Sequence, residues 1–530
     1  MKVVSLHLLF VIQLLCYGLV NGLRILQIVP GFTNSHVLFN YRLADTLTAE
    51  GHSVKMWTQM EMGMVVAGDL RMPQNVSEVR VPIYFSDTMK SEGLKVFQTM
   101  MFQAGSAYDL YWTGQEFKDL RVQSCEQMLS VDSSVINEFR QDYFHLVIGH
   151  FHDFCPIALT KLVGVKELVW ITHGTSVYDY TAIQIGMRTF PSFVPHPLSS
   201  FSDRMSLYER ILNVFWHLSN IDFVNLPQNL LHDENSMYRR CEFNTIAVHF
   251  LFPVHKASGD EDLWSLSRRV RVLLVNGERF LDFPKPIPFG VNFIGEVKTA
   301  TKNSPLNFTG EVAEIVNRAT NLVIFSLGTV SNTTNMPSNM LNSFLEAFAQ
   351  FPEYDFLWRM EAEVPNAHKY TNVHLLKWLP QKDLMKHPKT RLLIAHGGYN
   401  SFLEASQAGI PVVLMPLFAD QFINAKRAQR FGIATTLDKL SLSVEKVRAA
   451  VAEILFNEKY SQNAKRLSAM LRSKPSTDPS AMLKYGLKLA TLPRDHFTLR
   501  AAQNLNFVAF YNLDAISFIF LLPTLLFTFS

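Results

Sequence analysis

Residues Trp378 to Gln421 read WLPQKDLMKHPKTRLLIAHGGYNSFLEASQAGIPVVLMPLFADQ, in which apolar runs alternate with polar punctuation. The apolar run Leu392–Ala395 predicts a short buried strand that stops at His396-Gly397-Gly398, just before a helix begins. A strand, a glycine pair and a helix start together place several backbone N–H groups and the positive end of a helix dipole at one point. This pattern indicates a site where a diphosphate is held without a metal.

The helix and the strand that follow carry further polar residues. Asn400 and Ser401 open the predicted helix, and Ser401 and Glu404 are spaced as in a capping box. A second apolar strand, Val412–Met415, is followed by Asp420-Gln421. Because ligands of open α/β sheets bind at the carboxyl edge of parallel strands, we expect these polar groups to face one ligand.

This segment resembles the signature of the UDP-glycosyltransferases, the family that includes the UDP-glucuronosyltransferases, and it matches nearly every defining position. A glycine pair before a helix is by itself an ordinary tight turn, so the inference rests on the whole segment. The resemblance implies these contacts with the sugar nucleotide: uracil stacks on Trp378, the nucleoside is bound by Gln381, the diphosphate by His396, Gly397, Gly398, Asn400 and Ser401, the ribose by Glu404, and the sugar by Asp420 and Gln421.

The resemblance covers almost the whole mature chain and implies the GT-B architecture, an α/β fold of two facing Rossmann-like domains with parallel sheets. It places the donor in the C-terminal domain and the acceptor in the N-terminal domain. The implied reaction is an inverting, metal-independent transfer of glucuronic acid or glucose from a UDP-sugar to a hydroxyl of a small lipophilic acceptor, as in detoxification. The UDP-sugar is then a co-substrate, and no cofactor is expected.

The start of the mature chain predicts a βαβ unit. Leu23–Val29 forms a buried strand, apolar residues from Val37 to Leu47 recur at helical spacing, and Ser53–Thr58 is the next strand. His36 then lies at the start of the helix, where the family carries its catalytic base. An imidazole there should be neutral and able to accept a proton from an acceptor hydroxyl. The alternative is a histidine that serves as an ordinary helix cap.

The sequence departs from the family at the residue that orients this base. After the predicted strand Phe144–Gly149, His150 occupies the place where the family usually has an aspartate or glutamate. A neutral imidazole can orient His36 through a hydrogen bond, but it cannot offset the positive charge that forms on the base. Asp153 is the nearest carboxylate, and it either takes over as the partner or caps the following helix.

Length and charge set the organisation of the chain. Its 530 residues suit two domains of about 250 residues each. A net charge of +3 with 18% charged residues gives no electrostatic case for nucleic acid as a partner. We predict a signal peptide in 1–22, an acceptor-binding domain in 23–285, a UDP-sugar-binding domain with a crossover helix in 286–500, and a membrane anchor in 506–529. The proline-rich segment Phe283–Pro288 would be the linker.

Other segments carry weaker signals. Leu322–Leu327 predicts the first strand of the second half, and Thr329 in the following turn would approach the diphosphate, as in the family. Arg359, at the end of a predicted strand, either contacts the nucleotide or pairs with an acid. The aromatic and methionine-bearing region Met187–Phe252 would shape an apolar acceptor pocket. Asp260-Glu261-Asp262 resembles a metal-binding triplet but is more typical of a solvated turn, so no metal site is expected.

The N-terminus predicts entry into the secretory pathway. The apolar run Val3–Val20 is followed by small residues suited to cleavage after Gly22. Three sequons are then either glycan sites or chance tripeptides, at Asn75, Asn307 and Asn332. Among the mature cysteines, a bridge between Cys125 and Cys155 and buried free thiols are the two alternatives.

The C-terminal tail predicts a membrane contact. From Ala501 to Ser530 the only charge is Asp514. A spanning helix needs about twenty residues, which the apolar run Ile516–Phe529 reaches only by including Asp514 and its neighbours. We predict a short anchor, with an interfacial helix or a removed lipid-anchor signal as alternatives. With the resemblance, this implies an endoplasmic reticulum membrane protein with luminal catalytic domains, and a homo-oligomer stays open.

Two functions therefore stand beside each other. The first is an active transferase. The second is a UDP-sugar binder whose catalysis is weakened or altered because His150 replaces the usual carboxylate. A transporter or receptor is disfavoured because at most one C-terminal segment is apolar enough to span a membrane.

Overall fold

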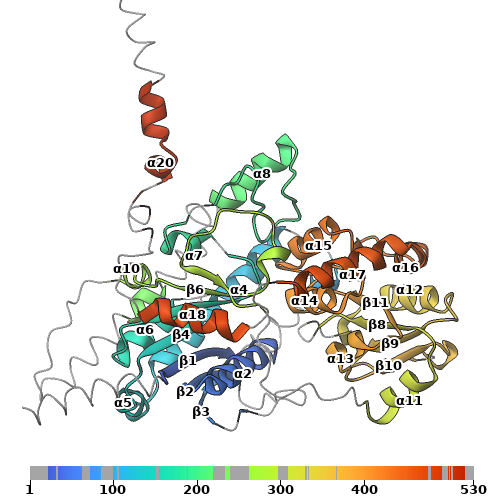
Figure 1. Cartoon of the computed structure of the whole chain (residues 1–530), viewed down its shortest axis with the longest axis horizontal. Coiled ribbons are helices and arrows are strands. Elements are labelled where there is room, and N and C mark those ends of the chain that lie inside the picture. Colours follow the sequence, from blue (N-terminus) through green and yellow to red (C-terminus); the bar gives the residue numbers. More distant parts are fainter. Residues whose placement is uncertain are drawn as a thin grey trace, which may run out of the picture.

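The computed structural model describes most of the chain between the two termini and part of the C-terminal tail (Figure 1). The described residues are 22–31, 34–61, 72–73, 75–84, 100–103, 107–150, 154–177, 179–187, 189–218, 233–238, 262–295, 308–328, 331, 333–365, 367–474, 479–491, 499, 502, 505 and 507–519. Residues 1–21 of the predicted signal peptide, Asp153, Thr329, Asn307 and Asn332 lie outside them.

Two parallel sheets form the centres of two domains (Figure 1). The strands of the first sheet are β1 (Arg24–Gly31), β2 (Ser53–Glu61), β3 (Val76–Ile83), β4 (Leu146–His150), β5 (Leu168–His173), β6 (Leu273–Asn276) and β7 (Val291–Phe293), in the order β3-β2-β1-β4-β5-β6-β7. The strands of the second are β8 (Leu322–Ser326), β9 (Asp355–Arg359), β10 (Val373–Leu376), β11 (Thr390–Ala395), β12 (Val412–Leu414) and β13 (Ala434–Thr436), in the order β10-β9-β8-β11-β12-β13. All neighbouring pairs are parallel, so crossovers must join them.

Helices cover the faces of both sheets, as parallel strands buried on both sides require. In the first half these are α2 (Asn34–Ala49), α4 (Ala107–Leu129), α5 (Ser133–Gln141), α6 (Cys155–Leu162), α7 (Asp179–Gln184), α8 (Leu207–Leu218), α10 (Leu263–Ser267) and the 3₁₀ turn η4 (Arg279–Leu281). In the second they are α11 (Gly310–Arg318), η5 (Thr333–Asn335), α12 (Ser338–Phe348), η6 (Ala367–Lys369), α13 (Gln381–Lys386), α14 (Tyr399–Ala408), α15 (Gln421–Arg430), α16 (Val444–Phe456) and α17 (Glu458–Arg472), followed by α18 (Pro479–Thr491) and α20 (Phe507–Phe510).

The strands form the cores because they are nearly continuous apolar runs. Every residue of β4 (LVIGH) and of β8 (LVIFS) is buried. Each sheet packs one apolar cluster on each of its faces, around Trp57 and Tyr41 in the first sheet and around Phe402 and Phe344 in the second. The predicted α/β fold with two Rossmann-like domains is confirmed.

The strand order reverses at the same place in both sheets. β1 pairs with both β2 and β4, and β8 pairs with both β9 and β11. The loops that leave these strands diverge to opposite faces, and ligands of open parallel sheets bind in the crevice between them. His150 ends β4, and His36 follows β1. Gly328 and His396 follow β8 and β11. The positions at which the strand order of the two sheets reverses, which we call switch points, therefore both carry predicted site residues.

The boundary between the domains differs from the prediction. β7 follows the proline-rich segment Phe283–Pro288 and pairs with β6. The first domain therefore continues beyond residue 285, and the segment that reads as a linker lies inside it. β7 is not apparent from the sequence because its three residues, VNF, include a polar asparagine and form no apolar run.

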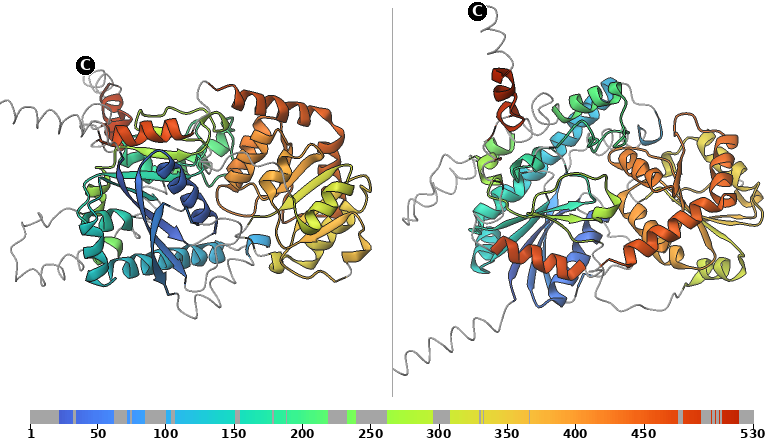
Figure 2. Two further views of the ribbon diagram at one scale, coloured as in Figure 1. Left: turned by 60° about the horizontal axis from the view of Figure 1, so that its bottom comes forward. Right: turned by 45° about the horizontal axis from the view of Figure 1, so that its top comes forward.

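Two segments cross between the domains. α18 returns to the first domain, where Leu483 and Leu487 are buried in the cluster on one face of its sheet (Figure 2). In the opposite direction, Met101 and Phe102 are buried in a core cluster of the second domain. The Lys439 ammonium helps to hold that segment, because it donates to the carbonyls of Met100, Met101 and Leu417 at 2.9 Å each.

The structure settles the state of the paired cysteines. Cys125 and Cys155 form a disulfide, with their Cα atoms 5.6 Å apart. The bond joins α4 to the first residue of α6, directly after β4. Of the two alternatives left by the sequence, the bridge is therefore correct.

The tail is described only in part. Residues 507–510 form α20, and residues 513–519 are also helical. Among the described residues, we find no helix with both the length and the apolarity needed to cross a membrane. Much of the predicted anchor 506–529 lies outside the described residues.

Candidate active site

His36 lies in the first turn of α2, immediately beyond the carboxyl end of β1. Burial lowers the pKa of His36 from 6.5 to about 4, although a hydrogen bond with the Pro30 carbonyl acts in the opposite direction. The imidazole is therefore neutral at neutral pH, as the sequence predicted, but the largest cause is burial and not the helix terminus. A neutral ring that donates one N–H to a carbonyl keeps a lone pair on its other nitrogen to accept a proton.

His150 lies beside this ring. The two imidazoles are stacked, with centroids 6.2 Å apart and planes inclined by 11°. The Asn40 side chain connects the His150 ring to the backbone of His36, because its Nδ2 donates to the His36 carbonyl at 2.9 Å and lies 3.0 Å from His150 Nε2. His150 Nε2 also lies 3.3 Å from Asn40 Oδ1, so it accepts from the Asn40 amide in one tautomer and donates to it in the other.

A series of buried hydrogen bonds continues from Asn40 into the first sheet. The Gln27 side chain donates from Nε2 to Asn40 Oδ1 at 2.5 Å, and both amide side chains are fully buried. The Asn40 amide thus holds the His150 ring, and Gln27 holds Asn40. Asp153, the other candidate partner, lies outside the described residues, while Phe154 is the N-cap of α6. Sequence reasoning missed Gln27 and Asn40, although a glutamine inside an apolar strand was a usable signal.

The diphosphate turn of the second domain differs in one detail from the prediction. α14 begins at Tyr399, with Gly398 as its N-cap and no side-chain cap, so the capping box of Ser401 and Glu404 is wrong. Because the helix starts before Ser401, these two side chains instead lie on one face, where both accept hydrogen bonds from Gln381 Nε2, at 3.1 and 3.2 Å. The N–H groups at the start of α14 remain available to an anion.

His396 occupies a narrow space between two glycines. A Cβ on Gly328 would lie 2.6 Å from His396 Cε1, and a Cβ on Gly398 would lie 2.6 Å from His396 Nε2. Burial lowers the pKa of His396 to about 4, so the ring is neutral. Its Nδ1 is buried and has no hydrogen-bond partner within the described part of the chain. The two glycines thus fix the orientation of an imidazole beside the anion-binding turn.

Arg359 and Trp378 form the neighbouring wall. The guanidinium donates to the Gly328 carbonyl at 2.6 Å and pairs with Glu361 at 2.6 Å, which agrees with the second of the two roles proposed for it. Its Cζ lies 5.4 Å from the centre of the Trp378 ring. Trp378 is 41% exposed, so an indole face is accessible for stacking. Thr329 lies outside the described residues.

Asp420 and Gln421 lie at the start of α15. Gln421 Oε1 accepts from the backbone N–H groups of Leu417 and Phe418, at 2.8 and 3.1 Å, which orients its NH₂ group as a donor. Asp420 is partly buried, and removal of its carboxyl group from water raises the pKa of that group. The residue before it, Ala419, has φ of 53°, a left-handed conformation that alanine rarely adopts and that is common at ligand sites.

Asn424, one turn further along α15, joins the two parts of the second-domain site. Its Nδ2 donates to the Gly397 carbonyl at 3.0 Å and to Asp420 Oδ2 at 3.1 Å. One amide therefore ties the glycine turn to the carboxylate after β12. No local pattern marks the role of Asn424, because its partners come from different loops.

Tyr399 brings the two domains together at the site. Its hydroxyl accepts from the Glu278 backbone N–H at 2.8 Å. A Cβ on Gly174, in the loop after β5, would lie 3.1 Å from Tyr399 Cβ. The start of α14 is therefore packed against the carboxyl edge of the first sheet. Within the described residues no group of side chains could hold a metal ion, and Asp262 of the acidic triplet caps α10 by accepting from the Ser265 N–H at 2.7 Å.

Two facing Rossmann-like domains with a nucleotide-type site in the second define the class of GT-B glycosyltransferases. The model of the family "UDP-glucoronosyl and UDP-glucosyl transferase" matches residues 26–529, and the chain belongs to this family. It is 56% identical over 506 residues to the putative UDP-glucuronosyltransferase ugt-60 of Caenorhabditis elegans, covering 95% of this chain and 97% of that protein. It is 27% identical to UDP-glucuronosyltransferase 1-2 of Rattus norvegicus, over 76% of this chain and 71% of the relative.

A solved structure has the same fold. Phytolacca americana UGT2, complexed with UDP-2fluoro-glucose and pterostilbene, superposes with a TM-score of 0.57 over 89% of this chain and 99% of its own, at 14% identity. The resemblance stated from the signature segment is thereby confirmed, and the protein is a glycosyltransferase by family.

Proposed function

We propose that this protein transfers glucuronic acid or glucose from a UDP-sugar to a hydroxyl group of a small lipophilic acceptor, with inversion and without a metal. The observation that carries the proposal is that the switch point of the first sheet and that of the second are packed together. Neutral His36 lies at the first, and the His396-Gly397-Gly398 turn lies at the second. Tyr399 packs the second against the first.

The chemistry follows from these groups. His36 accepts the proton of the acceptor hydroxyl while the acceptor oxygen forms a bond to the anomeric carbon. The bond from that carbon to the diphosphate oxygen breaks, and its electron pair leaves with UDP. The N–H groups at the start of α14 and the neutral His396 ring stabilise the charge that develops on the diphosphate. Gln421 and Asp420 are placed to bind sugar hydroxyls.

A second candidate, a UDP-sugar binder with weakened catalysis, also has a specific observation in its favour. His150 stands where the family usually has a carboxylate, and the Asn40 amide holds its ring. A base with a pKa near 4 is weak, and a neutral imidazole in the place of a carboxylate does not offset the imidazolium that forms.

One assay tests both candidates. The purified full chain is incubated with UDP-glucuronic acid or UDP-glucose and a panel of phenols, and UDP release is measured beside UDP binding by calorimetry. We expect acceptor-dependent UDP release with one of the donors. UDP binding without release with any acceptor would favour the second candidate, and the absence of both would contradict the proposed function.

We also propose that the protein works on the luminal side of the endoplasmic reticulum membrane. A disulfide is typical of oxidising compartments, and Cys125 and Cys155 form one. Asn75, in the first sequon, is exposed and so accessible for glycosylation. The apolar tail would supply the membrane contact.

α8 supports this proposal because its apolar face is exposed and its polar face is turned toward the protein. Four of its apolar side chains are more than half exposed: Leu207 (66%), Tyr208 (70%), Ile211 (59%) and Phe215 (63%). The opposite face carries buried Asn213, whose Nδ2 donates to the carbonyls of Pro191 and Val194 at 2.7 and 2.8 Å. Apolar side chains on the outside and polar ones on the inside suit a helix that lies on lipid.

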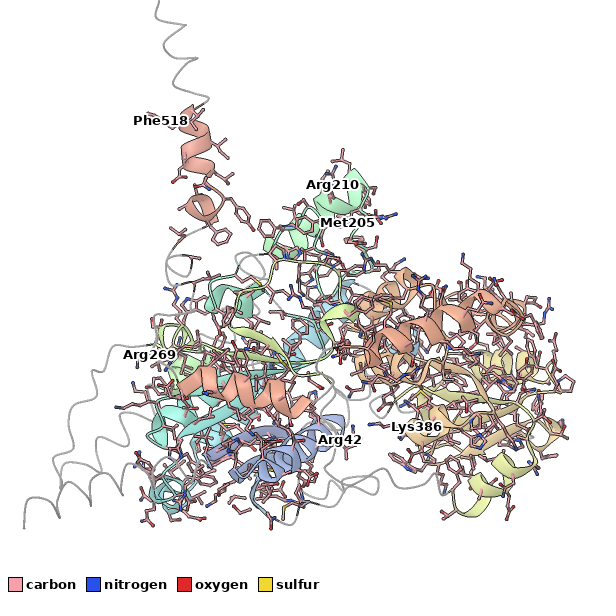
Figure 3. All side chains as sticks on the ribbon, in the orientation of Figure 1. Arg42, Met205, Arg210, Arg269, Lys386 and Phe518 are labelled. Carbon is pink, nitrogen blue, oxygen red and sulfur yellow. A yellow bond between two sulfur atoms is a disulfide. The ribbon has the colours of Figure 1, made fainter. Side chains whose placement is uncertain are left out.

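The tail and α8 rise from the same side of the molecule (Figures 1 and 3), where Arg210 marks α8 and Phe518 the tail. Thr189 links the tail to α8. The Tyr511 hydroxyl of the tail donates to the Thr189 carbonyl, and the Thr189 hydroxyl lies 3.0 Å from Nδ1 of His217 on α8. We therefore take a lipid surface as the partner of this face.

Substitution of α8 tests the lipid contact. Ile211→Ser with Phe215→Ser should lower partitioning onto phosphatidylcholine vesicles at least about tenfold, because two large apolar side chains lose a membrane environment. The measurement is vesicle flotation of the full chain. Leu440→Ser with Phe456→Ser is the matched control, since these second-domain residues are 58% and 62% exposed. Equal flotation of the two variants would contradict a role for α8.

A further inference from the structure

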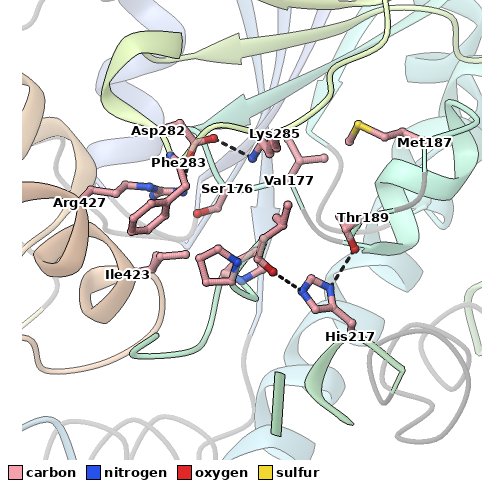
Figure 4. A pocket seen from close by; sticks show the side chains of 13 residues that line it. Ser176, Val177, Met187, Thr189, His217, Asp282, Phe283, Lys285, Ile423 and Arg427 are labelled. Carbon is pink, nitrogen blue, oxygen red and sulfur yellow. Dashed lines mark hydrogen bonds and ion pairs between the residues drawn. The ribbon is translucent and has the colours of Figure 1, made fainter. Parts of the chain in front are cut away.

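A buried ionic cluster lies at the junction of the two domains, within a pocket distinct from the loops of His36 and His396 (Figure 4). Asp282, which follows η4 in the first domain, pairs through Oδ2 with Lys285 at 2.7 Å. Its Oδ1 pairs with Arg427 Nη2 of α15, in the second domain, also at 2.7 Å. The Asp282 and Arg427 side chains are both only 3% exposed.

The other branch of the Arg427 guanidinium leads into the donor side of the active site. Nη1 donates to Asn424 Oδ1 at 2.6 Å. Asn424 Nδ2 in turn donates to the Gly397 carbonyl and to Asp420 Oδ2. A continuous series of hydrogen bonds thus runs from an acidic residue of the first domain to both the glycine turn and the carboxylate of the second-domain site.

Arg427 determines which way the Asn424 amide faces. Gly397 and Asp420 present only acceptors to this side chain, so both need the NH₂ end. Arg427 is a donor only, and it requires the carbonyl end. If the guanidinium were absent, the buried Asn424 oxygen would lose its donor, and the side chain that holds the turn and the Asp420 carboxylate would be less firmly fixed.

We propose that Asp282 and Arg427 are positioning residues through which the first domain controls recognition of the donor sugar. The inference rests on the proposed function, since it takes Asp420 and the glycine turn as the sites for the sugar and the diphosphate. Asp282 holds Arg427, the rigid fork of Arg427 holds Asn424, and Asn424 sets Asp420 relative to Gly397. Sugar recognition is then complete only when the two domains are closed on each other.

The ion pair is better explained by this role than by stability alone. Burying two charges costs about as much as their attraction returns, so such a pair contributes little net stability. A guanidinium that divides its two terminal nitrogens between an acid of one domain and an amide of the other has a geometric function instead.

Arg427→Lys provides the sharpest test. A lysine keeps the positive charge opposite Asp282, but one ammonium on a flexible chain cannot hold both Asp282 and Asn424. We expect the dissociation constant of UDP-glucose or UDP-glucuronic acid, whichever the wild type uses, to rise about tenfold, while that of UDP rises less than about threefold. Asp282→Asn should change the same ratio in the same direction, and it serves as the second variant if Arg427→Lys does not fold.

The control removes another ion pair from the same junction. Lys474 pairs with Glu278 but contacts no part of the Asn424 network that the structure describes, so Lys474→Met should leave both dissociation constants unchanged. An unchanged ratio of UDP-sugar to UDP affinity in Arg427→Lys and Asp282→Asn, or an equal change in Lys474→Met, would overturn the proposal. A wild type that binds no UDP would overturn the proposed function itself, which separates the two failures.

Discussion

Replacement of His36 by alanine is expected to lower kcat/KM by about 10²- to 10⁴-fold, the usual contribution of a general base, and to leave the affinity for UDP unchanged. The reason is the division of labour between the domains. His36 belongs to the switch point of the first sheet, whereas the proposed nucleotide contacts all belong to the second. Steady-state kinetics with the best donor and acceptor, together with calorimetry of UDP, measure both quantities.

The pH dependence of kcat/KM should report the titration of His36. Because burial lowers the pKa of His36 to about 4, the ring is neutral above that pH and protonated below it. Only the neutral form accepts a proton, so kcat/KM should be flat through the neutral range and fall as the pH drops through about 4. This limb should be absent from the residual activity of His36→Ala.

Asp153→Asn, assayed in parallel, separates the possible partners of the base. If Asp153 supports His36, turnover should fall while UDP binding persists; if His150 alone orients the ring, turnover should stay. Should neither His36→Ala nor Asp153→Asn lower turnover in a protein that still binds UDP, the assignment of the base would be wrong.

Local patterns made much of the fold predictable. The predicted strands Leu322–Leu327 and Leu392–Ala395 correspond to β8 (Leu322–Ser326) and β11 (Thr390–Ala395), because apolar runs bounded by polar residues define strands without tertiary information. β7 (VNF) and β13 (ATT) hold too few apolar residues to form such a run, whereas the equally short β12 (VVL) continues into Met415. β3 (VSEVRVPI) is longer, but charged residues interrupt its apolar pattern. The start of α14 was placed too late because a serine and a glutamate at capping spacing outweighed Gly398, which caps the helix with its backbone alone.

The candidate site also has a part that the sequence predicts and a part that it does not. Its signature residues lie within one segment, so the sequence could group them. Asn40, Asn424, Arg427 and Asp282 could not be found, because their roles depend on partners from distant parts of the chain. Contacts of this kind form only when the two sheets and their loops are assembled. An asparagine or arginine in a helix has no local sequence feature that distinguishes it from a surface residue.

Gly398→Ala is expected to weaken UDP binding by about 10- to 100-fold, somewhat less than the effect of deleting an oxyanion donor on turnover. Gly398 has φ of −58° and ψ of 141°, values that alanine adopts freely, so the substitution adds volume without backbone strain. The new methyl group would lie 2.6 Å from His396 Nε2. The imidazole has little room to move, because Gly328 also approaches it so closely that a Cβ there would lie 2.6 Å from His396 Cε1. Calorimetry of UDP gives the change.

Two further proteins make this result specific. Gly409→Ala, at the other end of α14, forces alanine to a φ of 76° and should lower the melting temperature while UDP affinity is kept. His396→Ala with Gly398→Ala should bind UDP no more weakly than His396→Ala alone, because the methyl group then has no ring to displace. Additive losses in that pair, or wild-type affinity in Gly398→Ala, would show that the imidazole between the two glycines does not hold the diphosphate.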